Sequence, residues 1–397
     1  MSHRTTREHD ELRAIVRELA TERIAPRAAE IDAGSEFPWD LKELLAGQDL
    51  LGTCFEERHG GTALDNVAQA ILVEEIARAD ATTSLIPIVQ KLGALPILIA
   101  GSDEQKARYF PRLASGEWLI AFALTEAGAG SDVAAMRMRA RRDGDDYLLT
   151  GSKRFITHGS IAKVLTVFAL TDPEAGGRKG MSAFIVETDT PGFSAPRLEH
   201  KMGIRGSPTA ELNFDDVRVP AANRLGDEGD GFKIAMATLD RSRLSVAAQA
   251  IGIAQGALDF AVGYAAERRQ FGERVADMQG IQFMLADMAS QTEAARQLTY
   301  AAAASVDVAD PDLAYWTSCA KLVAGDTAMR VTTDAVQVLG GYGYVSEYPV
   351  ERMMRDAKIT QLYEGTQQIQ RMIVARQLLK RAGVSRDTKS QRGTPSA

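Results

Sequence analysis

The chain has 397 residues, 45% hydrophobic and 25% charged, which is the composition of a soluble globular enzyme with two or three domains. Its net charge of -7 argues against a nucleic-acid-binding surface that covers the whole molecule. The two cysteines, Cys54 and Cys319, have no CxxC spacing, so the sequence predicts neither a disulfide framework nor a zinc site.

Residues 1 to 119 are predicted to form an α-helical domain. The chain starts with charged sequence and has no apolar signal core, and no run of about 18 apolar residues follows, so we expect a cytoplasmic protein without a membrane segment. Gly101 and Ser102 have the residue types that end one helix and cap the next. Apolar residues at helical spacing are Leu12, Ile15, Val16, Leu19 and Ile24, and then Val67, Ile71, Leu72 and Ile76.

Residues 120 to 230 change to a period of two, which is typical of strands. Residues 163 to 171 and 181 to 188 are rich in Val, Phe, Ile and Thr, and Gly144 follows an aspartate at a predicted turn. Short strands at this spacing favour a small β-barrel or a sandwich.

Residues 231 to 383 return to long helical patterns, including an alanine-rich stretch from 294 to 304, and predict a bundle of antiparallel helices. The last segment, 384 to 397, is rich in Ser, Lys, Arg, Gly and Pro and is predicted to be a flexible tail.

A carboxylate near the C-terminus lies between two predicted helices. Glu364 is followed by Gly365, which lets a ligand approach the backbone closely, and by Thr366, which can cap the next helix. Taken alone, a glutamate beside a helix start is usually a solvated partner of the helix dipole.

A second motif, residues 122 to 132, is small, hydroxylated and glycine-rich, a composition that suits a polar, flat or phosphorylated ligand. It does not match GxGxxG, because Val133 occupies the place of the third glycine, so a dinucleotide fold of the Rossmann type is rejected.

Together, these two motifs resemble the acyl-CoA dehydrogenase family, and the resemblance continues through residues 155 to 157, 268 to 272 and 337 to 341. It implies an α+β multidomain fold with an N-terminal α-helical domain, a central small β-barrel and a C-terminal four-helix bundle. It also implies α,β-dehydrogenation of an acyl-CoA thioester to the trans-2-enoyl-CoA, with Glu364 removing the α-proton and hydride passing to FAD.

The resemblance implies two groups of FAD-binding residues. In the first, Phe155 covers the isoalloxazine and Thr157 bonds near its reactive nitrogen; Ala127 and His158 depart from the residues that the family usually shows. The second group contacts the FAD of a neighbouring subunit, which implies a homo-oligomer, usually a tetramer. The first group comprises Phe122, Leu124, Thr125, Gly130, Ser131, Phe155, Ile156, Thr157, Thr366 and Gln368, and the second comprises Arg268, Gln270, Phe271, Gln279, Gln337, Val338, Leu339, Gly340 and Gly341.

The resemblance also implies a substrate site and an electron acceptor. Some relatives carry the base one residue before the matching arginine, but Ser242 stands there and cannot serve. An electron-transfer flavoprotein is the implied acceptor. Residues 85 to 92 contain no arginine to hold a second carboxylate, which favours short or medium monocarboxylic acyl chains. The implied substrate residues are Ser131, Asp240, Arg243, Tyr363 and Gly365.

Two alternatives stay open from the sequence. One is an acyl-CoA oxidase or flavin monooxygenase of the same fold, which rapid peroxide formation in air would reveal. The other is a nucleic-acid-binding homologue, suggested by basic residues near the C-terminus and opposed by the acidic net charge and by Glu364. These basic residues are Lys380, Arg381, Arg386, Lys389 and Arg392.

Overall fold

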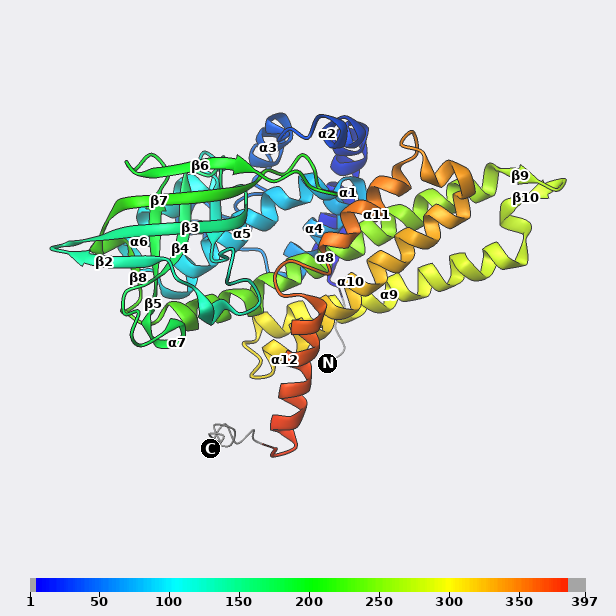
Figure 1. Cartoon of the computed structure of the whole chain (residues 1–397). Coiled ribbons are helices and arrows are strands. Elements are labelled where there is room, and N and C mark those ends of the chain that lie inside the picture. The colour runs from blue at the N-terminus through cyan, green and yellow to red at the C-terminus, as the bar shows by residue number, and fades with distance from the viewer. Residues whose placement is uncertain (1–4, 385–397) are drawn as a thin grey trace, which may run out of the picture.

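The computed structural model describes residues 5–384 in three consecutive parts: helical, β and helical (Figure 1). The predicted order of these parts is confirmed, with the change from helix to strand falling between Ala114 and Ile120. The proposed domain limits stay a prediction. The predicted flexible tail, except for Val384, lies outside the described residues.

The N-terminal part is helical, and polar caps set where several of its helices begin. The hydroxyl of Ser102 accepts a hydrogen bond from the Gln105 amide while the Gln105 side chain bonds back to the Ser102 amide, so the cap predicted at Ser102 is confirmed. One turn of π-helix, Ala20–Ile24, follows the first helix. The helices are α1 (Arg7–Leu19), α2 (Ala28–Gly34), α3 (Trp39–Ala46), α4 (Asn66–Ala79), α5 (Ala81–Ala100) and α6 (Asp103–Ala114).

The β part pairs its strands along one path, β6-β7-β3-β2-β4-β5-β8, with β1 added in parallel to β4. Gly144, at φ +62°, lies in the turn predicted between β2 and β3. This part also contains a short α-helix, α7 (Gly177–Gly180). The strands are β1 (Ile120–Ala123), β2 (Arg139–Asp143), β3 (Asp146–Thr157), β4 (Val164–Leu170), β5 (Met181–Glu187), β6 (Phe193–Leu198), β7 (Thr209–Pro220) and β8 (Arg224–Leu225).

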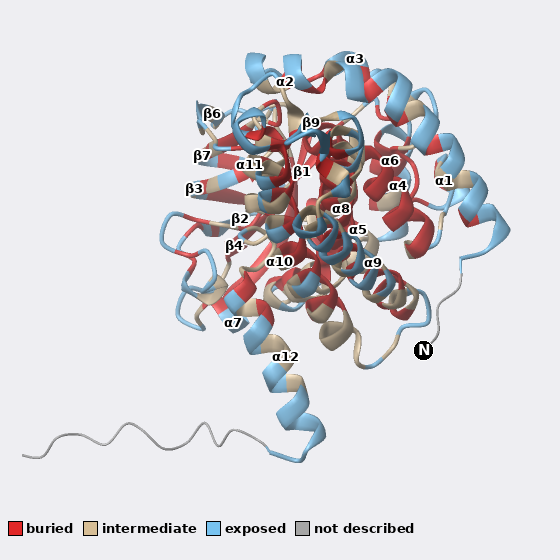
Figure 2. Ribbon diagram, turned by 90° about the vertical axis from the view of Figure 1, so that its right-hand side faces the viewer, coloured by how far each residue is buried: buried red, intermediate tan, exposed pale blue. Residues whose placement is uncertain are grey.

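The C-terminal part packs long helices against α4, α5 and the sheet, and a small hairpin of β9 and β10 projects from the end far from the β part (Figure 1). Its core is continuous with that of the other parts, as the buried residues running through α5, α8 and α10 show (Figure 2). The elements are α8 (Gly231–Glu267), β9 (Arg269–Gln270), β10 (Glu273–Arg274), α9 (Gln279–Asp307), α10 (Leu313–Leu339), α11 (Pro349–Ile359) and α12 (Gln367–Arg381).

Two helices, α5 and α8, are apolar and long enough to cross a membrane by length and composition alone. In each, 72% of the most apolar window is buried inside the protein, as in the core helices of a soluble protein. The expectation from the sequence that no membrane segment is present did not consider these two helices.

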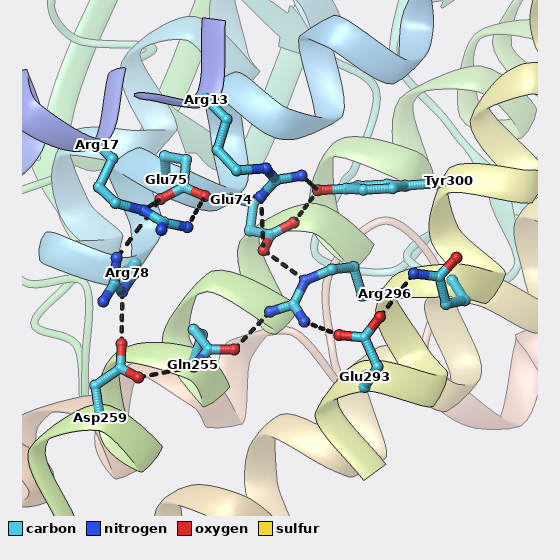
Figure 3. A network of polar contacts seen from close by, with 11 residues as sticks. Arg13, Arg17, Glu74, Glu75, Arg78, Gln255, Asp259, Glu293, Arg296 and Tyr300 are labelled. Carbon is cyan, nitrogen blue, oxygen red and sulfur yellow. Dashed lines mark hydrogen bonds and ion pairs between the residues drawn. The ribbon is translucent and has the colours of Figure 1, made fainter. Parts of the chain in front are cut away.

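A network of charged side chains joins α1, α4, α8 and α9 beneath the surface (Figure 3). Glu74, 1% exposed, accepts hydrogen bonds from the Arg296 guanidinium at 2.8 Å and from the Tyr300 hydroxyl, and Arg13 lies 3.6 Å away. Its neighbour Glu75, also 1% exposed, pairs with Arg13 and Arg17. The buried carboxylates therefore tie α1 and α9 to α4.

Candidate functional site

The turn that carries Glu364 connects α11 to α12. α11 ends at Ile359 and α12 begins at Gln367, so Glu364 lies between two helices as predicted. Glu364 and Gly365 have positive φ angles of 48° and 91°, which reverse the chain sharply, and Thr366 caps α12 by accepting from the Ile369 amide, as predicted. A non-glycine residue held at positive φ is strained, so its surroundings must hold it there.

Two buried side chains hold this turn. The Lys321 ammonium, 0% exposed, donates to the Gly365 carbonyl at 2.7 Å and to Gln367 Oε1 at 3.2 Å. Gln370 donates to the carbonyls of Gly365 at 2.9 Å and Glu364 at 3.3 Å. α10 and α12 therefore fix the backbone of the turn, and neither Lys321 nor Gln370 was predicted from the sequence.

The Glu364 carboxylate accepts a hydrogen bond from the Ser242 hydroxyl on α8. Burial raises the pKa of Glu364 above its usual value, and the Ser242 hydrogen bond and the charges of Arg243, Lys321 and Lys91 oppose that rise. Ser242 thus touches the proposed base although it cannot be a base itself. Its position one residue before Arg243 was visible in the sequence, but the contact was not.

The Arg243 guanidinium, 4% exposed, braces α8 against α10 and α12. It donates to Asp240 at 2.8 Å, to Ser318 at 2.6 Å and to Gln370 at 3.0 Å. Burial raises the pKa of Asp240, and the charge of Arg243 lowers it. Tyr363 donates to Gln249 on α8. The structure gathers Asp240, Arg243, Tyr363 and Gly365 around Glu364; their substrate-binding role stays a prediction.

The loop after β1 is anchored to β3 by a buried ion pair. The Lys153 ammonium, 0% exposed, donates to Glu126 Oε1 at 2.9 Å and to the Leu124 carbonyl at 3.0 Å. The Arg154 amide donates to the Thr125 carbonyl at 2.8 Å. The glycine-rich loop and residues 155 to 157 are therefore neighbours. Lys153 and Glu126 hold them together. Glu126 lies within the motif of residues 122 to 132, but no role was predicted for it, and Lys153 lies outside the predicted motifs.

Phe155 projects from a bulge at the end of β3. The pairing of β3 with β7 shifts register between Lys153 and Ile156, and Phe155 has φ 59°. The Phe155 ring is 58% exposed, Ile156 is buried, and Thr157 is half-buried, so Phe155 and Thr157 are accessible on either side of a buried residue. Exposed Phe155 and half-buried Thr157 therefore place an apolar and a polar side chain at this end of β3.

His158, the residue after Thr157, is buried and is held by a contact with Ser207. Its ring lies 3.0 Å from the Ser207 hydroxyl, and burial lowers the pKa of His158 to about 3, so the ring is neutral at physiological pH. The nearby Ile204 amide donates to Asp356 on α11, which brings this end of the β part against the helix that leads to Glu364.

The second predicted group lies at the far end of the bundle, apart from Glu364 (Figure 1). Arg268, Gln270 and residues 337 to 341 line an open groove of about 510 Å³, and the Arg268 guanidinium lies 5.1 Å from the Tyr342 ring centre. Phe271 is 96% exposed at the tip of the β9–β10 hairpin, and Gln279 begins α9. Within one chain, this group is therefore separate from the Glu364 turn.

Lys91 is a cation on α5, within the segment of residues 85 to 92 that contains no arginine. It is 9% exposed and donates to Asn66 Oδ1 at 2.9 Å. Its charge is one of those that lower the pKa of Glu364. The absence of an arginine therefore does not leave this helix without positive charge.

No group of three or more His, Cys, Asp or Glu side chains is placed to hold a metal ion within residues 5–384.

Comparison with known proteins gives matches along nearly the whole chain. The models of the acyl-CoA dehydrogenase N-terminal, middle and C-terminal domains match residues 6–117, 121–217 and 229–379. The "Probable acyl-CoA dehydrogenase fadE25" of Mycobacterium leprae is 51% identical over 373 residues, which cover 94% of this chain and 96% of that protein.

Two further relatives have more specific names. The cyclohex-1-ene-1-carbonyl-CoA dehydrogenase of Geobacter metallireducens is 51% identical over 366 residues, 92% of this chain and 96% of that protein. The solved structure of butyryl-CoA dehydrogenase from Megasphaera elsdenii superposes with a TM-score of 0.93 at 44% identity, over 96% of this chain and 100% of that one.

Proposed function

Because the chain belongs to the acyl-CoA dehydrogenase family, we propose that it dehydrogenates an acyl-CoA thioester between Cα and Cβ, with Glu364 as the base and FAD as the cofactor. The observation that carries this proposal is the turn at Glu364. Lys321 and Gln370 hold its backbone, in which Glu364 has a strained positive φ. The Glu364 carboxylate accepts a hydrogen bond from Ser242 and has a raised pKa.

The residues of the β part fit a flat cofactor. An exposed aromatic ring at Phe155 offers an apolar face, and Thr125 and Thr157 beside it offer polar atoms. Gly128 and Gly130 have open space where a Cβ would be, so the loop leaves room for a ligand to approach its backbone. Bound FAD would supply the hydride acceptor. Phe122, Leu124, Thr125, Gly130, Ser131, Phe155, Ile156, Thr157, Thr366 and Gln368 are the residues that would hold it.

The chain's own contribution is proton transfer and positioning. Glu364 takes the α-proton of the thioester, and its raised pKa makes it a stronger base than a solvated carboxylate. The amide of Glu364 lies in a turn held by α10 and α12, so it can donate to the developing enolate oxygen without moving. Tyr363, Asp240 and Arg243 shape the substrate side of the turn.

The substrate series tests this proposal directly. Purified protein is mixed anaerobically with butyryl-, octanoyl-, cyclohex-1-ene-1-carbonyl- and glutaryl-CoA, and the loss of flavin absorbance is recorded. We expect short or medium monocarboxylic acyl groups to reduce the flavin fastest. Fast reduction by glutaryl-CoA would contradict the expected preference for monocarboxylic acyl groups, and no reduction by any thioester would refute the proposal.

Replacing Lys321 by methionine is expected to lower turnover by about 10²-fold, since a catalytic group misplaced by about 1 Å costs that much. It also removes the donor to Gly365 and Gln367, at a cost of about 1–3 kcal/mol in the free energy of unfolding. Stopped-flow flavin reduction at saturating substrate measures the loss. Lys179→Met, at an exposed position, is the control. If Lys321→Met reduces its flavin at the wild-type rate, the turn keeps its conformation without Lys321.

Ser242 is expected to set the pH at which the enzyme becomes active. The active form of Glu364 is the carboxylate, so kcat/KM rises as pH increases through its pKa. Ser242→Ala removes a hydrogen bond that lowers this pKa, so the rising limb should move to higher pH. The pH profile of kcat/KM measures this shift, and Ser290→Ala, at an exposed position, is the control. A rising limb that stays in place or moves to lower pH would show that Ser242 does not lower the pKa of Glu364.

We also propose that the chain works as a homo-oligomer, a tetramer in its family, in the cytoplasm. The groove at the far end of the bundle supports this, because Arg268, Gln270, Phe271, Gln279 and residues 337 to 341 lie apart from the Phe155 surface of their own chain. A second chain can bring them to one cofactor. Sedimentation of the FAD-loaded protein tests the assembly, and Arg268→Gln should weaken FAD retention without altering Glu364.

An electron-transfer flavoprotein is the proposed acceptor. The alternative, an oxidase that uses oxygen, predicts rapid peroxide formation in air with acyl-CoA alone. We expect peroxide to form slowly and turnover to need added electron-transfer flavoprotein.

A further inference from the structure

A second cavity, of about 380 Å³, opens between α1, the π-turn, α4, α8 and α11. It contains none of the residues assigned above to FAD, thioester or base. One wall is the π-turn Ala20–Ile24, a geometry that is rare in proteins and is frequently found at functional sites. The cavity lies beside the charged network of Figure 3.

Most charges around this cavity are already neutralised. Arg17 forms two hydrogen bonds with Glu75, both at 2.9 Å, and Arg78 bonds Asp259 at 2.6 Å (Figure 3). These arginines are therefore bound to carboxylates of the chain itself. They are therefore not free to pair with a ligand.

Arg352, on α11, differs from them. It is only 9% exposed, yet it makes no hydrogen bond and no ion pair within 4.0 Å with any residue between 5 and 384. Its charge lowers the pKa of Asp80 and of Asp356 from a longer distance. Some polar side-chain atoms of the described residues are inaccessible to solvent and have no hydrogen-bond partner, but no nitrogen of Arg352 is among them. The Arg352 nitrogens therefore remain accessible, and the residue lines the cavity.

A buried guanidinium without a partner is costly, because it loses its hydration and gains no hydrogen bond in return. Its planar fork matches the two oxygens of a carboxylate or phosphate. The rest of the lining is mainly apolar and includes Phe260, Met353, Pro349 and Ala20. An anionic head group and a short apolar body would therefore satisfy both halves of the cavity.

We propose that this cavity binds a small molecule with a carboxylate or phosphate head and a short apolar body, whose head pairs with Arg352. The site is independent of the proposed dehydrogenation, so either proposal can fail without the other.

Titration calorimetry of the full-length, FAD-loaded protein tests the site with three probes: hexanoate, hexyl phosphate and inorganic phosphate. We expect wild type to bind at least one probe, and Arg352→Gln to weaken that binding about 10- to 100-fold, the loss of hydrogen bonds to a charged group. Exposed Arg141→Gln, which loses the same charge on the β part, should bind as wild type does. Comparison of the probes identifies the head group and shows whether the apolar body contributes.

A second variant keeps Arg352 and fills the cavity. Ala25 is an exposed residue on the cavity rim, so Ala25→Phe should block binding without disturbing the core. Ala25→Phe leaves the Glu364 turn unchanged, so hexanoate that binds beside Glu364 would still bind to this variant. Absence of binding to wild type at millimolar probe, or wild-type affinity in either Arg352→Gln or Ala25→Phe, would overturn the proposal.

Discussion

Glu364→Gln is expected to keep the fold and the bound flavin and to slow flavin reduction by acyl-CoA by at least about 10²- to 10⁴-fold. Glutamine has nearly the same shape as glutamate and can still meet the Ser242 hydroxyl, but it cannot accept the α-proton. The backbone contacts of Lys321 and Gln370 do not involve the side chain that changes.

Anaerobic stopped-flow mixing measures this effect as the rate at which the flavin absorbance disappears. Glu57→Gln, an exposed residue of the N-terminal part, loses the same charge and should reduce its flavin as wild type does. If Glu364→Gln reduces its flavin as fast as wild type, then the base is another residue.

Glu74→Ala is expected to lower the free energy of unfolding by about 3–5 kcal/mol, the usual cost of removing one partner from a buried ion pair. The alanine leaves Arg296 and Arg13 without this carboxylate in a buried setting and removes the acceptor of the Tyr300 hydroxyl (Figure 3). Urea denaturation measures the difference.

Glu293 offers a matched comparison, because it pairs with the same Arg296 but its side chain is 53% exposed. Glu293→Ala should cost no more than about 1 kcal/mol, since solvent screens an exposed pair. Equal losses in the two variants would show that burial of Glu74 contributes nothing to the strength of the network.

Local signals in the sequence predict much of the fold. The cap at Ser102, the turn at Gly144 and the cap at Thr366 depend on neighbours within a few residues, and each lies where its residue type predicts. The residues 163 to 171 and 181 to 188, rich in Val, Phe, Ile and Thr, likewise predict the strands β4 and β5.

Contacts between distant segments could not be predicted in this way. Lys321 precedes the Glu364 turn by more than forty residues and Ser242 by more than a hundred. Lys153 looks like an ordinary strand residue until the fold buries it against Glu126. No local pattern predicts these partners, because tertiary packing alone brings them together.

The bulge at Phe155 shows the same limit at short range. Regular alternation puts Phe155 and Thr157 on one face, but it does not predict the register shift against β7 or the positive φ that exposes the ring. Both depend on how β3 meets β7 and the loop after β1.

The central claim, that Glu364 removes the α-proton of a thioester, is tested most directly by hydrogen exchange at Cα. Enzyme whose flavin has been reduced beforehand is incubated with a saturated acyl-CoA in D₂O, and deuterium in the thioester is measured by mass spectrometry. Since hydride transfer is blocked, exchange reports proton abstraction alone. We predict that wild type introduces deuterium at Cα and that Glu364→Gln does not; incorporation by Glu364→Gln at the wild-type rate would contradict the account.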